Sequence, residues 1–329
     1  MNISIIGDGG WGTTLAILLA KKGYAVTLWG AFKEYTDYLN KKRVNTKFLP
    51  GVKIPAGIKI THDLKEALGN KGLIVLAVPS QYLRKVIRGF REIGYSRKSI
   101  YLSVTKGIEI NSLKRISEII SEELGRVKIA VLSGPTIAHE VAAGKPTTAV
   151  IASNDPLTRK RLQDIFITER FRVYTNSDVA GVELGGSLKN VIAIACGISD
   201  GLGFGTNTKA ALLSRGLAEI SRLGIKMGAK NSTFSGISGL GDLVTTCISQ
   251  HSRNRFVGEQ IGKGKKLAVI RSQMQMIAEG VPTAKSAYQL SLRYKVSMPI
   301  TQEVYSVLYK NKSAQQAVED LMTRKKKEE

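Results

Sequence analysis

The sequence has few of the residues that build a disulfide framework or a metal centre. Only two cysteines, Cys196 and Cys247, and three histidines occur among 329 residues. Two cysteines cannot form a framework and favour a reducing compartment, and no Cys, His or Asp spacing predicts a metal site. No apolar run reaches the length of a membrane span, and the strand-like run from Asn2 leaves no room for a signal peptide. We therefore expect a cytoplasmic protein with no membrane span and no metal.

Acidic residues are also scarce, because 26 Asp and Glu face 49 Lys and Arg, which gives a net charge of +23 at pH 7. Such an excess attracts nucleic acid, an acidic membrane surface or small anionic substrates. The basic residues are spread along the chain, and we find neither a zinc-finger spacing nor an aromatic-flanked RNA signature. The composition therefore favours small anions as ligands and disfavours a nucleic-acid partner.

The first half of the chain alternates short apolar runs with helical periodicity, which predicts an α/β fold with a doubly wound, mostly parallel sheet. The run NISIIG ends in a glycine, and a helical segment follows it up to Gly23. The predicted strands lie in residues 2–7, 25–29, 72–79, 99–104, 127–135, 147–153 and 171–176.

The hydrophobic periodicity changes after about Asn176, where every further segment has helical spacing and no strand is convincing. A chain of this length accommodates two domains. We therefore predict a dinucleotide-binding domain of Rossmann type over residues 1–177 and an all-helical substrate and catalytic domain over residues 178–329.

The stretch GDGGWG matches the pattern G-x-G-x-x-G between a predicted strand and a predicted helix. In this pattern Gly7 permits the tight turn, Gly9 lets the backbone approach a pyrophosphate, and Gly12 lets the helix pack on the strand. The helix N-terminus then faces the phosphates with a partial positive charge. The motif predicts binding of a dinucleotide, although a glycine-rich turn without a ligand has the same sequence.

The second strand lacks the acid that usually binds the ribose of NAD, since it continues as Trp29-Gly30-Ala31-Phe32-Lys33. Lys33 stands near the place of a 2′-phosphate, which favours NADP, or the use of both NADP and NAD, with NADPH favoured. The alternative is that Lys33 is a solvated residue at the start of a helix.

An ammonium group, Lys189, stands within the otherwise small and apolar stretch GGSLKNVIAIACG. Burying a charge there is costly, so the side chain either reaches water along its stem or serves chemistry. An apolar environment disfavours the charged form, and an amine of this kind can donate and accept a proton.

With these motifs in view, the chain resembles the bacterial type of NAD(P)-dependent glycerol-3-phosphate dehydrogenase over nearly its whole length. The pieces that carry the resemblance are GDGGWG (7–12), AVPS (77–80), SVTKGIE (103–109), SGPTIAHEVA (133–142), GGSLKNVIAIACGISDGLGFGTNTKAAL (185–212), GLGDLVTTC (239–247) and SRNRFVG (252–258). The resemblance implies reversible reduction of dihydroxyacetone phosphate to sn-glycerol 3-phosphate, which supplies phospholipid synthesis, and a homodimer.

The resemblance also implies roles for particular residues. It makes Lys189 the general acid and base and Asp242 the residue that holds it, and it gives Lys106, on the cofactor and substrate side, as the third catalytic residue. The residues implied on the substrate side are Lys106, Gly134, Thr136, Lys189, Asn190, Asp242, Thr246, Ser252, Arg253 and Asn254. Those implied on the cofactor side are Gly7, Gly9, Gly10, Trp11, Gly12, Phe32, Lys33, Lys106, Ala138, Arg253, Ile277 and Glu279. No metal is implied.

Two departures from the family pattern, one alternative role for a residue and two alternative functions stay open at this point. Gly10 stands where relatives often carry serine, and residues 30–33 lack the arginine often found there. Asp242 is also a candidate for a helix N-cap before LVTTC. The alternative functions are a β-hydroxyacid dehydrogenase, which acts on a carboxylate, and a non-catalytic dinucleotide sensor.

Overall fold

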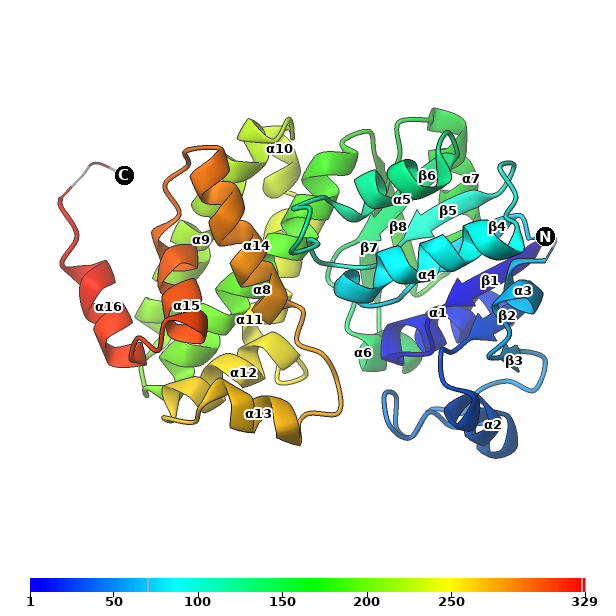
Figure 1. The fold of residues 1–329 in the computed structure, drawn as a ribbon, viewed down its shortest axis with the longest axis horizontal. Coiled ribbons are helices and arrows are strands. Elements are labelled where there is room, and N and C mark those ends of the chain that lie inside the picture. Colours follow the sequence, from blue (N-terminus) through cyan, green and yellow to red (C-terminus); the bar gives the residue numbers. More distant parts are fainter. Residues whose placement is uncertain (70, 327, 329) are drawn as a thin grey trace. The chain divides into compact units, whose positions relative to one another are not determined.

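The computed structural model describes residues 1–69, 71–326 and 328, and the chain separates into two units (Figure 1). Unit 1 consists of Met1–Lys106 and Lys114–Glu183, and unit 2 consists of Gly107–Leu113 and Leu184–Glu329. The short segment Gly107–Leu113 thus belongs to unit 2 although residues of unit 1 flank it on both sides.

Unit 1 is built on one sheet with the strand order β3-β2-β1-β4-β5-β6-β7-β8. The strands are β1 (Asn2–Ile6), β2 (Ala25–Trp29), β3 (Lys59–Thr61), β4 (Leu73–Leu76), β5 (Ile100–Ser103), β6 (Lys128–Ser133), β7 (Thr147–Ala152) and β8 (Phe171–Asn176). Neighbouring strands are parallel except β6 and β7, which are antiparallel. The chain order reverses at β1, between β2 and β4, which confirms the predicted doubly wound, mostly parallel sheet.

The strand β3 is the one that the sequence analysis did not predict. It is three residues long and begins with an exposed lysine, Lys59, so it carries too short an apolar run to give a periodic signal. It pairs with β2 through Thr27, Leu28 and Trp29 and so extends the sheet on that side.

Helices cover both faces of the sheet, and each face has its own hydrophobic core. The helices of unit 1 are α1 (Gly10–Lys21), α2 (Lys33–Lys42), α3 (Leu64–Leu68), α4 (Ser80–Ile93), α5 (Ile116–Leu124), α6 (Ala138–Ala142) and α7 (Pro156–Phe166). One core joins the sheet to α1, α2, α6 and α7. The other joins it to α3, α4 and α5, with Phe90 and Tyr101 fully buried.

Unit 2 is helical in all its described elements, as predicted. They are α8 (Val179–Gly201), whose first residues belong to unit 1, α9 (Thr206–Lys226), α10 (Asn231–Phe234), a π-helical turn η1 (Ile237–Gly241), α11 (Asp242–Ile248), α12 (Arg253–Gly262), α13 (Leu267–Gln273), α14 (Gly280–Arg293), α15 (Pro299–Tyr309) and α16 (Ala314–Met322). Residues 181–199 of α8 are all buried, so this helix forms the centre of the unit (Figure 1).

Helix α8 corrects one expectation from the sequence. It has 23 residues and is long and apolar enough by composition to cross a membrane, although no apolar run of that length was expected. Of its most apolar window, 89% is buried inside the protein. The apolar character of α8 is therefore accounted for by its place as a core helix.

Candidate active site

The glycine-rich loop between β1 and α1 has the geometry that a dinucleotide site requires. Gly7 has φ +123°, and a Cβ there would lie 2.6 Å from the carbonyl oxygen of Ala77. A Cβ at Gly12 would lie 1.9 Å from the carbonyl oxygen of Gly7. No described atom lies within 4 Å of a Cβ built at Gly9, so its backbone is open to a ligand. These positions match the three glycine roles of the motif.

Two polar atoms of the same loop are buried without a hydrogen-bond partner among the residues that the structure describes. They are Oδ2 of Asp8 and Nε1 of Trp11. The first N–H groups of α1 also lack partners within the helix and face the loop with a partial positive charge. Unmet donors at a helix N-terminus suit a pyrophosphate, so the residues present fit a dinucleotide.

A second loop, which contains Asn45 and Phe48, packs on the glycine-rich loop. This packing explains why no serine stands at position 10. The buried side chain of Asn45 donates to the carbonyl of Asp8 (2.8 Å) and to the hydroxyl of Thr13 (2.7 Å). This contact brings the carbonyl oxygen of Phe48 within 2.5 Å of a Cβ built at Gly10. Any larger residue at position 10 would therefore displace the second loop.

The predicted cofactor residues after β2 lie at the surface. Phe32 is 73% exposed and precedes α2, and Lys33 is the first residue of that helix. The ammonium of Lys33 pairs with Asp37 one turn later, at 2.8 Å. Both side chains of this pair are largely exposed, so the pair contributes little to stability and can open.

Of the remaining predicted residues of unit 1, two lie next to Lys106. Its ammonium donates to the carbonyl of Gly134 at 2.8 Å and lies 3.5 Å from the hydroxyl of Thr136. Gly134 has φ +135°, which favours glycine. Ala138 begins α6, and its carbonyl accepts from Thr14 of α1 at 3.2 Å. The structure thus brings Lys106, Gly134 and Thr136 together as the sequence analysis predicts.

In unit 2, Lys189 is buried and does not reach water along its stem. It is 4% exposed and Asp242 is 1% exposed. The ammonium donates to Oδ1 of Asp242 and to the hydroxyl of Thr246, and that hydroxyl donates to the carbonyl of Asp242 at 2.7 Å. A buried ammonium held by a carboxylate and a hydroxyl is oriented as well as neutralised.

Asp242 does not cap the helix that follows it. The chain enters α11 from the π-helical turn η1, so Gly241 takes the cap position and Asp242 is the first helical residue. Its carboxylate is directed to Lys189, 53 positions earlier in the chain. The N-cap alternative from the sequence analysis is therefore wrong.

Glycines fix the position of α12 against α8. A Cβ at Gly197 of α8 would lie 2.0 Å from the carbonyl oxygen of Arg255, and one at Gly258 of α12 would lie 2.0 Å from that of Ile194. Gly201 and Gly262 make similar contacts one turn further along. Because small residues on both helices let the backbones touch, the start of α12 is held at a fixed place relative to α8.

The predicted phosphate residues lie at that start. Ser252 is the N-cap of α12, and its hydroxyl accepts from the N–H of Arg255 at 3.2 Å. Arg253 is exposed and donates to the carbonyl of Ile277 at 2.9 Å. Arg253 and Ile277, which are both predicted on the cofactor side, are therefore in direct contact.

Asn190 and Asn254 are buried and link three helices. The Asn254 amide donates to Oδ1 of Asn190 at 2.9 Å and accepts from the N–H of Gly280 at 2.8 Å. Gly280 directly follows Glu279, the last predicted cofactor residue, so this network also positions the segment that carries Ile277 and Glu279. Asn254 thus has a packing role in addition to any contact with a ligand.

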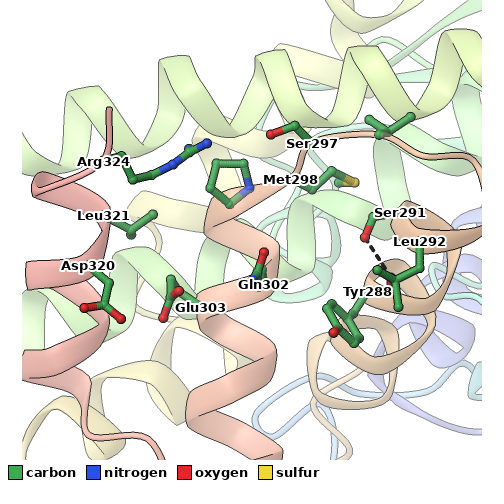
Figure 2. A pocket seen from close by; sticks show the side chains of 12 residues that line it. Tyr288, Ser291, Leu292, Ser297, Met298, Gln302, Glu303, Asp320, Leu321 and Arg324 are labelled. Atoms are coloured by element: carbon green, nitrogen blue, oxygen red, sulfur yellow. Dashed lines mark hydrogen bonds between the residues drawn. The ribbon is translucent and has the colours of Figure 1, made fainter. Parts of the chain in front are cut away.

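Cavities alone would not have located these residues. One of about 370 Å³ lies between α14, α15 and α16, with Tyr288, Gln302 and Arg324 in its wall (Figure 2). Another of about 560 Å³ is lined mainly by α8, α9, α15 and α16. None of the predicted site residues lines either cavity. No cluster of potential metal ligands occurs among the described residues.

Three residues that shape the candidate dinucleotide site, Asp8, Asn45 and Phe48, were not predicted from the sequence. Asp8 carried one available signal, a carboxylate inside a glycine-rich phosphate motif. Asn45 and Phe48 carried none, because their importance depends on how one loop packs on another.

Family models match both parts of the chain. The N-terminal model of NAD-dependent glycerol-3-phosphate dehydrogenase matches residues 2–158, and the C-terminal model matches residues 178–319. The chain belongs to the NAD-dependent glycerol-3-phosphate dehydrogenase family.

Relatives named glycerol-3-phosphate dehydrogenase [NAD(P)+] match over the whole chain. Those from Chlorobium phaeobacteroides strain BS1 and Prosthecochloris aestuarii are 51% and 52% identical over 332 residues, covering all of this chain and 99% and 100% of the relatives. The crystal structure of glycerol-3-phosphate dehydrogenase from Coxiella burnetii is 40% identical with a TM-score of 0.95, covering 98% of this chain and 99% of that one.

A more distant likeness is one of fold alone. D-mandelate dehydrogenase has a TM-score of 0.67 at 13% identity, covering 97% of this chain and 99% of that one, so it shares the fold alone. Membership of the glycerol-3-phosphate dehydrogenase family thus confirms the resemblance seen in the sequence.

Proposed function

We propose that the chain catalyses the reversible reduction of dihydroxyacetone phosphate to sn-glycerol 3-phosphate with NADH or NADPH, which supplies glycerophospholipid synthesis. Family membership over both parts of the chain supports the reaction. The observation that carries the mechanism is the buried ammonium of Lys189, held by Asp242 and Thr246.

Unit 1 supplies the dinucleotide site in this proposal. The backbone at Gly9 and the first turn of α1 hold the pyrophosphate, with Gly7 and Gly12 permitting the loop. The bound nicotinamide supplies hydride in one direction and accepts it in the other. Lys33 attracts a 2′-phosphate, and the NADPH preference predicted from the sequence stays a prediction.

Unit 2 supplies the proton. As hydride reaches the carbonyl carbon, negative charge develops on the ketone oxygen, and Lys189 donates a proton to it. In the reverse direction the neutral amine accepts the proton of the alcohol. Asp242 and Thr246 hold the amine in one orientation, so it does not have to be positioned during the reaction.

The start of α12 supplies the phosphate site. Arg253 offers a planar pair of N–H donors, and the N–H groups of the first turn add a partial positive charge. Ser252, Thr246 and Asn254 complete the set of unit 2 residues that we assign to the substrate. Lys106 of unit 1 is assigned to the substrate on the resemblance to the family alone. A guanidinium and a helix N-terminus also bind carboxylates, so it is the family match over both parts of the chain that counts against a β-hydroxyacid dehydrogenase.

We further propose that residues 1–177 and 178–329 act as the cofactor and the substrate domain, and that the enzyme is a cytoplasmic homodimer. The resemblance to the family supports the dimer. The two cysteines, both free and buried, are consistent with a reducing compartment.

The test combines two variants with two substrates. Oxidation of NADH or NADPH is followed with dihydroxyacetone phosphate and with dihydroxyacetone. We expect Lys189→Ala to lower kcat by roughly 10²–10⁴, the usual size of general acid–base catalysis. Arg253→Ala mainly raises KM and lowers kcat/KM about ten- to a hundred-fold with the phosphorylated substrate alone.

A melting curve for each variant excludes misfolding. A folded Lys189→Ala enzyme with near-normal kcat would refute the proton-donor role. Wild-type protein without activity on dihydroxyacetone phosphate would refute the proposed reaction and leave the two alternatives, a β-hydroxyacid dehydrogenase and a dinucleotide sensor.

A further inference from the structure

The carboxylate of Asp8 lies at the end of β2, where the acid that usually binds the ribose of NAD is missing. Gly30 follows the last residue of β2, and a Cβ built there would lie 2.3 Å from Oδ2 and 2.7 Å from Cγ of Asp8. The carboxylate of Asp8 therefore occupies the position where a side chain at the end of β2 would begin. It comes from the glycine-rich loop, on the neighbouring strand of the sheet.

The environment of Asp8 leaves this carboxylate with an unmet demand for a hydrogen-bond donor. Its Oδ2 is buried and has no partner among the described residues, while the residue as a whole keeps part of its surface exposed. Its backbone is fixed by Asn45 at 2.8 Å. A donor brought by a ligand, such as a ribose hydroxyl, would meet that demand.

Two groups interact electrostatically with Asp8, one from the loop over the site and one from α2. The loop over the site brings Lys47, which lowers the pKa of Asp8, and α2 brings Tyr35, whose own pKa is raised by burial first and by the charge of Asp8 as a lesser cause. Lys33 of α2 is engaged by Asp37, and His62 after β3 is exposed. Burial outweighs Lys47 and raises the pKa of Asp8 to about 6.

In a doubly wound sheet the adenosine ribose lies between the glycine-rich loop and the end of the second strand, where an acid accepts from its 2′-hydroxyl. We propose that Asp8 replaces this missing acid and disfavours a 2′-phosphate, so that it sets the balance between NAD(H) and NADP(H). In this proposal Lys33 attracts the 2′-phosphate of NADP(H), whereas Asp8 repels it. The inference depends on the proposed function only through dinucleotide binding by unit 1.

The experiment measures binding without turnover. The probes are ADP-ribose and its 2′-phosphate, which lack nicotinamide, titrated by calorimetry into the full-length protein at pH 8. Asp8→Asn removes the charge with little change of shape. Glu34→Gln is the matched control, because Glu34 is an exposed acid in the first turn of α2 and the atoms nearest to a Cβ at Gly30 belong to Asp8 and Thr36.

We expect Asp8→Asn to shift the ratio of the two dissociation constants toward the 2′-phosphate by about ten-fold or more, as removal of a close like charge should. We expect Glu34→Gln to shift the same ratio by less than about three-fold, since exposed charges are screened. Asp8→Ala serves as a second variant if the first does not fold.

The pH dependence gives a further readout. As the pH falls from 8 to 5.5, wild-type protein should gain affinity for the 2′-phosphate relative to ADP-ribose by a larger factor than Asp8→Asn. The variant corrects for titration of the phosphate itself, which occurs in the same range. If both probes bind and the ratio is the same in wild type and Asp8→Asn, the role of Asp8 is refuted while the proposed function stands. If wild-type protein binds neither probe, both are refuted.

Discussion

Gly258 of α12 packs on the carbonyl of Ile194 in α8 so closely that a Cβ at position 258 would lie 2.0 Å from that oxygen. The neighbouring glycines make the contact continuous over two turns. The crossing holds the start of α12, with Ser252 and Arg253, relative to Lys189 on α8. The proton donor and the phosphate site that we propose are therefore set by one backbone contact.

Replacing Gly258 by alanine should force α12 away from α8. We expect a loss of about 1–3 kcal/mol in the free energy of unfolding, typical of overpacking, even though alanine favours a helix by about 1 kcal/mol. The KM for dihydroxyacetone phosphate should rise as the phosphate site moves. Urea unfolding and steady-state kinetics measure the two effects.

Gly205→Ala is the control for this prediction. Gly205 is the N-cap of α9 with φ −87°, and no described atom lies within 4 Å of a Cβ built there. The control should stay within about 1 kcal/mol of wild type. Equal stability of the two variants would show that α8 and α12 tolerate separation.

Removing Asp242 should leave the ammonium of Lys189 buried without its counter-charge. We expect Asp242→Ala to cost about 3–5 kcal/mol in the free energy of unfolding, as for other broken buried ion pairs. The double variant Lys189→Met with Asp242→Leu should recover most of that loss, because it removes both charges. Urea unfolding of the three proteins gives the comparison. A double variant no more stable than Asp242→Ala would mean that packing, not charge, causes the loss.

Changing Lys33 to glutamate should lower the affinity for NADPH relative to NADH by several-fold, because a negative charge then faces the 2′-phosphate. The exposed pair with Asp37 is worth about 0–1 kcal/mol, so it does not prevent Lys33 from meeting a phosphate. Lys41→Glu, in the last turn of the same helix, is the control for net charge. If Lys33→Glu and Lys41→Glu change the ratio of the KM values for NADPH and NADH equally, Lys33 is an ordinary surface residue.

The raised pKa of Asp8 makes stability without cofactor depend on pH. The native state keeps a proton on Asp8 that the unfolded chain releases, since burial raises its pKa from 3.8 to about 6. Stability contributed at this site is therefore fully present below about pH 4 and is lost as the pH rises to about 6. The loss is up to about 3 kcal/mol.

Asp8→Asn lacks this titration and should be the more stable protein at pH 7.5, with the difference vanishing near pH 4. Urea unfolding of the ligand-free proteins at several pH values measures it. A difference that is the same at pH 4 and pH 7.5 would contradict the burial of a charged carboxylate at this site.

The strands and the glycine-rich loop could be predicted because their signals are local. Buried parallel strands are continuous apolar runs, and Gly7 and Gly12 are required by the turn itself. By contrast, the residues that pack on this loop, Asn45 and Phe48, belong to a distant segment without a motif. Asp242 contacts Lys189 and does not cap α11 because the π-helical turn η1 precedes it, and no sequence pattern predicts such a turn.

The contact between Asp8 and Gly30 also constrains how this protein can change over time. A Cβ at position 30 would lie 2.3 Å from Oδ2 of Asp8 and 2.7 Å from Cγ2 of Thr36, and loss of Asp8 alone leaves the strand end without an acid. Moving the carboxylate from the loop to the strand therefore takes at least two substitutions and a shift of Thr36, and each single intermediate is either overcrowded or lacks the charge. The two positions should be altered together in any redesign, and they should be inherited as a pair.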